Sequence, residues 1–250
     1  MSIAPETYRP SLKPYPPVYS SANEKRRLAR RIERLLRKHY GPPPRRTHDA
    51  PLDVLVRTIL SQNTSDRNSH RAFERLKARF TDWTAVLSAP TRQIEATIRV
   101  GGLAKTKARR IKAILSQIRR PCDNLSLDWL CAMNAQEAAK VLTGFKGVGP
   151  KTIRCVLLFA CGMDVFPVDT HIFRVSRRLG LIPERATVKR AHELWDEFLP
   201  QGLAYSLHLG LIEHGRQTCF ARRPRCPHCC LRGLCRYYHT TFARYMTSPG

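Results

Sequence analysis

Short helical segments separated by turns dominate the centre of this chain, and this pattern limits the fold more than any other feature. Between positions 49 and 163, apolar residues recur three or four positions apart, and the runs end at glycines or at residues that commonly cap helices. The segment 52–60 is apolar enough for a buried helix, and Thr91 begins another that Gly101 and Gly102 end. Convincing alternation with a period of two, which half-buried strands require, is absent here. The sequence therefore predicts an all-α protein.

Further helices are expected at other points of the chain. Asn23 is the expected cap of a helix that runs to about position 39, and Asn134 the cap of the helix before the second glycine turn. The segment 187–198 has the buried stripe of an amphipathic helix. The ends differ: residues 1–21 are rich in proline, and residues 238–250 are polar. Both ends are therefore predicted to be flexible tails.

The chain carries a strong positive charge. Its 250 residues include 44 Lys and Arg against 19 Asp and Glu, which gives a net charge of +25. Such a field attracts polyanions, nucleic acid first and anionic membrane second; a merely solvated basic surface is the alternative. The longest apolar run, 156–163, is too short to cross a bilayer, and prolines occupy the place of a signal peptide's apolar core. We therefore expect a cytoplasmic protein without membrane attachment, associated with the nucleoid if the source is bacterial.

The nine cysteines are unevenly spread. Four are interpreted as small buried hydrophobic residues: Cys122, Cys131, Cys155 and Cys161. Four others have the spacing C-x6-C-x2-C-x5-C: Cys219, Cys226, Cys229 and Cys235. Without an export signal, such a cluster is more typical of metal binding than of disulfides. The spacing alone leaves zinc and an iron–sulfur cluster open, with Cys230 as an alternative ligand to Cys229.

A second constellation joins a glycine turn to a lysine and, further on, to an aspartate. The Gly147-Val148-Gly149 turn leaves its amides open to close approach, and Pro150 suits the first position of the helix that follows. A helix N-terminus of this kind attracts phosphate, and Lys151 stands just inside it. Asp169 precedes another helix. Taken singly, Lys151 would be a solvated or phosphate-binding lysine and Asp169 a helix cap.

Together these motifs resemble the endonuclease III family of DNA glycosylases, in the helix-hairpin-helix superfamily. FKGVGPKT is similar to the family's hairpin with its catalytic lysine, and FPVDTHIFRVSRRLGL to its aspartate segment. HGRQTCFARRPRCPHC…LC is similar to its cluster loop, with the same cysteine spacing. The resemblance extends from about position 25 to position 237, and the three motifs stand in the family's order.

The resemblance implies two helical lobes with a DNA cleft between them. A six-helix barrel lobe with the hairpin would span 49–163, and residues 22–48 would join 164–237 in an iron–sulfur lobe. Lys151 and Asp169 would face each other across the cleft. The resemblance also implies a [4Fe–4S] cluster ligated by the cysteines of the C-x6-C-x2-C-x5-C motif. The partner would be double-stranded DNA with damaged bases or abasic sites, bound by a monomer.

The resemblance also implies a reaction. The target base leaves the stack, because its glycosidic bond is inaccessible inside a duplex. Leu103, in GGLAKTKA, resembles the family's wedge residue, and either Gln62 or Asn63, in LSQNTSD, would be its polar intercalating residue. Lys151 would attack the deoxyribose to form a Schiff base with the help of Asp169, and β-elimination would then cut the strand. The implied enzyme is a bifunctional DNA glycosylase and AP lyase.

Two other functions compete with this interpretation. A monofunctional mismatch glycosylase of the same superfamily lacks the hairpin lysine, so Lys151 argues against it. A non-catalytic iron–sulfur protein that binds DNA or senses redox state would not need both Lys151 and Asp169. For the excised base, an oxidised pyrimidine is the expectation, and a G·T or G·U mismatch is the alternative. The shape of the base pocket decides between them, and the sequence does not give that shape.

Overall fold

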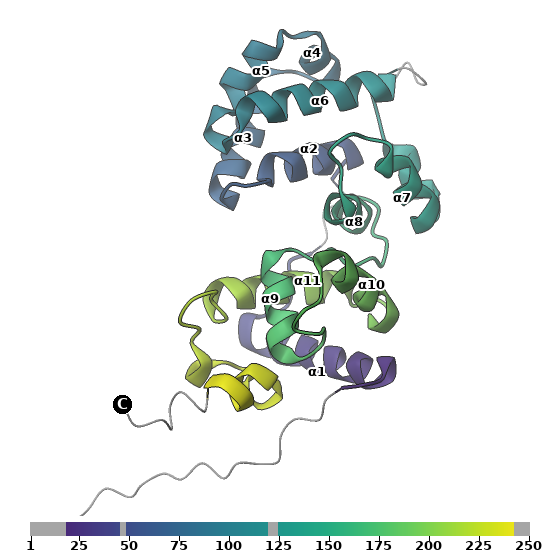
Figure 1. Ribbon diagram of the computed structural model, residues 1–250. Helices are drawn as coiled ribbons and strands as arrows, with labels where there is room; N and C mark the ends of the chain where they lie inside the picture. Colours follow the sequence, from purple (N-terminus) through teal and green to yellow (C-terminus); the bar gives the residue numbers. More distant parts are fainter. Residues whose placement is uncertain (1–18, 46–48, 120–124, 243–250) are drawn as a thin grey trace, which may run out of the picture.

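The computed structural model describes residues 19–45, 49–119 and 125–242, and their regular structure is helical (Figure 1). The α-helices are α1 Ala22–Tyr40, α2 Pro51–Ser61, α3 Asp66–Arg79, α4 Trp83–Ser88, α5 Thr91–Ile98, α6 Ala104–Arg119, α7 Ala135–Thr143, α8 Pro150–Phe159, α9 Thr170–Leu179, α10 Val188–Phe198 and α11 Ala204–Gln217. The shorter helices are η1 Arg99–Gly101, η2 Asp128–Ala132, η3 Cys226–His228, η4 Arg232–Leu234 and η5 Tyr238–Phe242. No β-strand occurs among the described residues, which confirms the prediction of an all-α fold.

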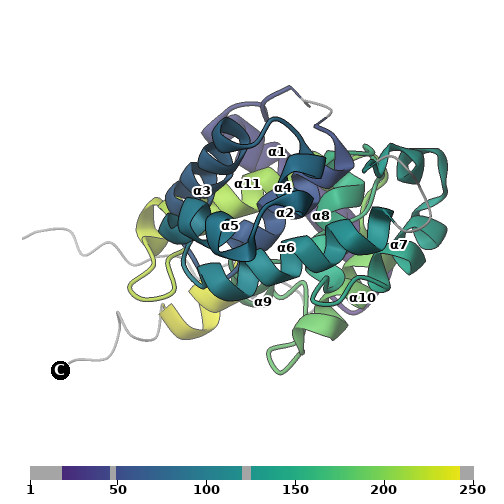
Figure 2. The ribbon, with the colours of Figure 1, turned by 90° about the horizontal axis from the view of Figure 1, so that it is seen from above.

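A first hydrophobic core is made by residues between 52 and 160. Its central element is α2, which packs against α3, α6 and α8. Figure 2 shows α3, α5 and α6 grouped with α2. Leu55, Ile59 and Leu60 of α2 lose all of their exposed surface there. The apolar segment predicted as a buried helix therefore forms the centre of this core.

A second core combines α1 with α9, α10 and α11, although α1 is far from them in the sequence (Figure 1). Helix α1 packs against α10 and α11. Trp195 is buried near the centre, where its ring stacks on Phe166 with 4.1 Å between centroids and its indole N–H donates to Ser176 at 3.1 Å. The predicted tails fall largely outside the described residues. At the C-terminal end, η5 extends helical structure through Phe242, beyond the point where a tail was expected.

Helix α8 joins the two cores. Val156 and Leu157 belong to the first core, whereas Leu158 belongs to the second. Two ion pairs also connect elements of the two cores: Arg154 of α8 with Asp196 of α10, and Arg216 of α11 with Asp66 of α3. Among the described helices, none has the length and apolar character needed to cross a membrane.

Helix caps explain most of the boundaries. Asn134 caps α7 as predicted, and its side chain accepts from the N–H groups of Gln136 and Glu137. The prediction for α1 was wrong by two residues, because Ser21 caps this helix in a reciprocal capping box with Glu24, and Asn23 lies inside it. Helix α4 was not predicted at all, since its six residues are too few to show a helical period.

The interpretation of the scattered cysteines as buried hydrophobic residues was partly wrong. Cys155 is a buried free thiol, as expected. Cys131 of η2, which is exposed, and Cys161, just after α8, instead form a disulfide. Two cysteines far apart in the sequence pair only when the fold places them together, and no local pattern reports this. Cys122 lies outside the described residues.

Candidate active site

The glycine turn joins α7 to α8, as the sequence predicts. Gly147 has a φ of 86°, and the buried Val148 anchors the turn in the first core. Gly149 is the N-cap of α8 and supplies no side-chain cap. Pro150 is the first residue of the helix and Lys151 the second. The start of α8 therefore has the free amides and positive dipole that bind phosphate oxygens.

Arg110 of α6 crosses this turn. A Cβ atom placed on Gly147 would lie 2.3 Å from the Nε atom of Arg110, so a side chain here would displace the guanidinium. The same guanidinium donates to the side-chain oxygen of Gln62 at 2.5 Å. Gln62 is thus tied to α6 beside the hairpin.

Asp169 is the N-cap of α9, and its Oδ1 accepts from the N–H of Ile172 at 2.7 Å. Two buried histidines hold the backbone just before it. The N–H of Val168 donates to Nε2 of His192 at 3.0 Å, and Nδ1 of His208 donates to the carbonyl of Pro167 at 3.0 Å. Helices α10 and α11 therefore fix the segment that presents Asp169.

Both histidines are neutral at pH 7. Burial lowers the pKa of His192 to about 4, and the Arg154 charge acts in the same direction. Burial likewise lowers the pKa of His208 to about 4, while the nearby Asp169 carboxylate opposes the shift. For His192 the hydrogen bonds also require a neutral ring, because its Nε2 accepts the hydrogen bond that the Val168 amide donates.

Lys151 and Asp169 act on the same buried groups. Burial raises the pKa of Cys155 to about 11, the charge of Lys151 lowers it and that of Asp169 raises it. Both charges also act on His208. Lys151 and Asp169 therefore both lie near Cys155 and His208.

A pocket opens beside Lys151, between elements of both cores. Its lining includes Lys151 and Cys155 of α8 and Tyr205 and His208 of α11. The wall from the first core is polar and consists of Asp49, Arg57, Thr58, Ser61, Asp66, Ser69 and His70, together with Val54. Sequence analysis missed these pocket residues, because nothing in their local pattern indicates that α2, α3, α8 and α11 meet here.

Arg57 is the most distinctive side chain of this wall. Its guanidinium donates to Asp49 at 2.6 Å and lies over the Phe73 ring, 4.7 Å from the centroid. Its Nε atom is buried without a hydrogen-bond partner among the described residues. A buried N–H without a partner is costly, whereas the side chain as a whole, 41% exposed, leaves part of the guanidinium open toward the pocket.

The candidate wedge residues stand on two tight turns. Asn63 has a φ of 52° and Leu103 a φ of 48°. Positive φ values are uncommon for residues other than glycine, and in the described chain only Arg223 shares this property. Leu103 is 57% exposed, more than any other large hydrophobic residue described. Both side chains are exposed, whereas Gln62 between α2 and Asn63 is held by Arg110.

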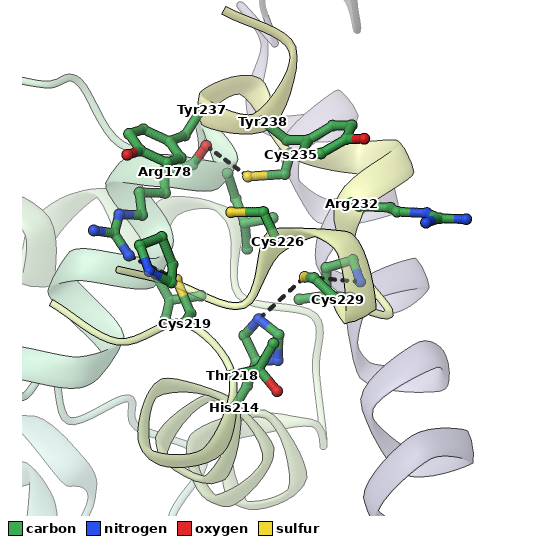
Figure 3. Close-up of a pocket in the computed structure, with 14 residues that line it drawn as sticks. Arg178, His214, Thr218, Cys219, Cys226, Cys229, Arg232, Cys235, Tyr237 and Tyr238 are labelled. Atoms are coloured by element: carbon green, nitrogen blue, oxygen red, sulfur yellow. Dashed lines mark hydrogen bonds between the residues drawn. The ribbon is translucent and has the colours of Figure 1, made fainter. Parts of the chain in front are cut away.

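The four predicted cysteine ligands line one pocket (Figure 3). Cys219, Cys226, Cys229 and Cys235 reach it from the loop after α11, and Val175 and Leu179 of α9 also line it. Cys230 and His228 are not among the lining residues. In the described chain, no three His, Cys, Asp or Glu side chains are grouped closely enough to hold a metal ion.

Hydrogen bonds from neighbouring elements reach the sulfur atoms of this pocket. Arg178 of α9 donates to the sulfur of Cys219 at 3.2 Å, and the N–H of Leu231 donates to that of Cys229 at 3.3 Å. Arg178 also donates to the carbonyl of Phe220 at 2.7 Å. N–H donors directed at sulfur favour thiolates, so these residues fit a group that binds four thiolates. Burial opposes that charge and raises the pKa of both Cys229 and Cys235 to about 12.

The fold and the sequence together define the class of protein. Residues 56–201 match the family described as the HhH-GPD superfamily base excision DNA repair protein. Endonuclease III of Sulfolobus acidocaldarius is 36% identical over 187 residues, which cover 74% of this chain and 81% of the relative. For Endonuclease III of Escherichia coli the identity is 31% over 212 residues, covering 84% and 96%. This chain therefore belongs to the HhH-GPD superfamily and, within it, to the endonuclease III family.

Other comparisons agree with this assignment. A protein of Arabidopsis thaliana named as a DNA glycosylase is 42% identical over 168 residues, but the match covers only 57% of that relative and 67% of this chain. A solved structure of a trapped covalent intermediate of endonuclease III and DNA has a TM-score of 0.73, with 26% identity over 88% of this chain and 98% of the other. A thermostable thymine-DNA glycosylase has a TM-score of 0.72 at 24% identity, which shows the shared fold.

Proposed function

We propose that this chain is a bifunctional DNA glycosylase and AP lyase that acts on double-stranded DNA in base excision repair. The observation that carries the proposal is the pairing of Lys151 at the start of α8 with Asp169 at the start of α9, around the same buried Cys155 and His208. The structural likeness to a covalent endonuclease III–DNA intermediate supports it. A non-catalytic DNA-binding protein would not need this pair.

In the proposed reaction, the Nζ lone pair of Lys151 forms a bond to C1′ of an extruded nucleotide. The glycosidic bond breaks, and the base leaves with its electron pair and takes up a proton. Ring opening converts the adduct into a Schiff base between Nζ and C1′. Loss of a proton from C2′ then expels the 3′ phosphate by β-elimination, which cuts the strand.

Asp169 has two possible tasks in this reaction: it takes a proton from the amine, or it stabilises the positive sugar as the base departs. In both tasks, the Asp169 carboxylate must be held in a fixed position. The cap to Ile172 and the two histidine contacts at 167–168 hold its backbone. Amides at the start of α8 would bind the phosphate beside the attacked sugar, with Gly147, Val148 and Gly149 forming the hairpin that grips the DNA backbone.

The pocket beside Lys151 is proposed to receive the extruded base. Its wall offers hydroxyls, an imidazole and the partly exposed guanidinium of Arg57, all of which can bond to base oxygens. An oxidised pyrimidine carries more such oxygens than an undamaged base, and a pocket built to bond them discriminates against bases that lack them. We propose Arg57 as the residue that contacts a carbonyl of this base.

For the gap that the extruded base leaves, we propose Leu103 and Asn63 as the inserted side chains. Both are exposed and stand on turns, whereas the Gln62 amide is already engaged by Arg110. This choice selects Asn63 from the two candidates that the sequence offers.

We further propose that Cys219, Cys226, Cys229 and Cys235 ligate a [4Fe–4S] cluster. Four thiols around one pocket, with N–H donors directed at two of the sulfurs, support this assignment. When bound, the cluster would fix the arginine-rich loop between 219 and 235 in one conformation. That loop could then contact phosphates from a rigid position.

A panel of lesion-bearing duplexes tests the function. Purified protein is incubated with matched duplexes that contain thymine glycol, another oxidised pyrimidine, a G·T or G·U mismatch, or no lesion, and the cut strands are resolved by size. We expect cutting of oxidised pyrimidines, and Arg57→Met should reduce it without affecting cutting at a preformed abasic site. Cutting confined to G·T and G·U would replace the proposed substrate, and no cutting of any duplex would overturn the proposed function.

A further inference from the structure

Lys107 of α6 is buried in the first core, with only 2% of its surface exposed. Its ammonium donates to the carbonyl of Leu60 at 2.7 Å and to the carbonyl of Gly101 at 2.8 Å. Burial lowers the pKa of this lysine, and the charge of Arg110 adds to the shift. A buried ammonium is costly unless it is hydrogen-bonded, so the two carbonyls are what holds this charge in the core.

The two carbonyls belong to the turns that carry the proposed wedge residues. Leu60 stands three residues before Asn63, at the C-terminal end of α2, and Gly101 stands two residues before Leu103, at the end of η1. Carbonyls at helix ends lack partners within the helix and carry partial negative charge. One ammonium therefore joins two helix ends that would otherwise present unpaired acceptors to each other.

The two turns also lie close to each other. A Cβ atom on Gly101 would lie 3.1 Å from the Cβ of Ala72 and 4.0 Å from the carbonyl oxygen of Leu60. Beyond this contact, the chain at Asn63 and at Leu103 takes up the left-handed conformation, which projects both exposed side chains from tight turns. This conformation is unfavourable for a residue other than glycine and persists only where the surroundings hold it.

We propose that Lys107 is a positioning residue that fixes the two wedge turns relative to each other, so that Asn63 and Leu103 enter the DNA as a pair. This inference rests on the proposed function, because it concerns extrusion of the base. Lys107 does not contact the substrate. Without it, each turn would still form part of the fold, but the spacing between the two side chains would vary.

Lys107→Met tests the proposal, because methionine keeps most of the buried stem and removes both hydrogen bonds. The measurement compares two single-turnover rates: excision of a paired lesion from a duplex, and cutting of a preformed abasic site in single-stranded DNA. Excision from the duplex requires both wedges, whereas single-stranded abasic DNA has no partner strand from which a base must be extruded. We expect the first rate to fall between about ten- and a hundredfold and the second to change less than about twofold.

Lys112→Met is the matched control. Lys112 lies on the same helix and also donates to a backbone carbonyl, that of Ala89 at 2.5 Å, but this carbonyl is remote in sequence from both wedge turns. The control should leave the ratio of the two rates unchanged. If Lys107→Met lowers both rates by the same factor, with a lower melting temperature, Lys107 is only a stabilising core residue and the proposal is wrong.

A double-mutant cycle gives a second test. In a background of Asn63→Ala with Leu103→Ala, Lys107 has no wedges left to position, so Lys107→Met should cause little further loss of duplex excision. If Lys107→Met lowers the rate of duplex excision by the same factor in this background as in the wild type, the proposal is wrong. If Lys107→Met does not fold, Lys107→Gln replaces it in the same comparisons. Glutamine keeps one amide donor, and the expected outcomes are the same.

The controls separate this inference from the proposed function. A wild-type protein that excises no lesion overturns the function itself, whatever the variants do. A wild-type protein that excises lesions, together with a Lys107 variant whose rate ratio is unchanged, overturns the positioning role alone.

Discussion

Gly147 illustrates how much a single position can determine in this site. Its positive φ disfavours any other residue, and a side chain here would displace Arg110. The sequence indicates a tight turn here, but only the fold reveals that Arg110 passes over it and reaches Gln62. Arg57 and Lys107 show the same limit. Both look like ordinary basic residues in the sequence, and their roles come from neighbours that lie far away along the chain.

Gly147→Ala should therefore damage the hairpin. The variant adds the cost of a left-handed alanine, about 1–3 kcal/mol, and also displaces the Arg110 guanidinium. Chemical denaturation of the wild type and the variant measures the loss in the free energy of unfolding. Gly149→Ala is the control, because its φ is −95° and no atom lies within 4 Å of the added Cβ. Equal losses for the two variants would contradict the proposed crowding by Arg110.

Cys229 and Cys230 are adjacent in the sequence and are both candidate ligands of the cluster. Only Cys229 lines the pocket with the other three cysteines. We expect the wild type to be brown, with iron and sulfide in equal amounts. Cys229→Ala should lose most of this iron, and Cys230→Ala should keep it. A colourless, active wild type that contains zinc would refute the cluster. Loss of iron only in Cys230→Ala would show that Cys230, and not Cys229, is the fourth ligand.

At the scale of elements, sequence analysis predicted most helices because their apolar period and caps are local signals. The Asn134 cap and the turn before α8 both follow from residues within one helical turn. The misses have a common cause. The short α4, the Cys131–Cys161 disulfide and the polar pocket wall depend on contacts between distant segments, which no local pattern encodes.

His192, which binds the backbone just before Asp169, should make the stability of the protein depend on pH. The pKa of His192 is about 4 in the folded protein, against about 6.5 in an unfolded chain. Between these values the unfolded chain binds more protons, so lowering the pH from 6.5 to 4 favours unfolding. Protonation of His192 in the unfolded chain should therefore lower the free energy of unfolding by up to about 3 kcal/mol as the pH falls through this range. Urea unfolding at pH 7 and pH 4.5 should show a weaker pH dependence for His192→Gln; an unchanged dependence would contradict the assignment.

For the whole molecule, charge and architecture act together. The net charge of +25 favours a polyanionic partner, and the all-α fold places Lys151 and Asp169 at the starts of α8 and α9 and the candidate wedges on two turns beside the first core. The sequence predicted the helical fold, the family and the order of the motifs. It did not reveal the pocket that would select the base, because four helices from different parts of the chain build it.

Lys151 as the nucleophile is the central claim, and borohydride trapping on abasic duplex DNA tests it most directly. Borohydride reduces a Schiff base to a stable bond, so the wild type should give a covalent protein–DNA adduct. Lys146→Gln, which removes an exposed lysine of the same hairpin, should still form the adduct, and Lys151→Gln should form none and should not cut the strand. A Lys151→Gln variant that traps and cuts as well as the wild type would contradict the account.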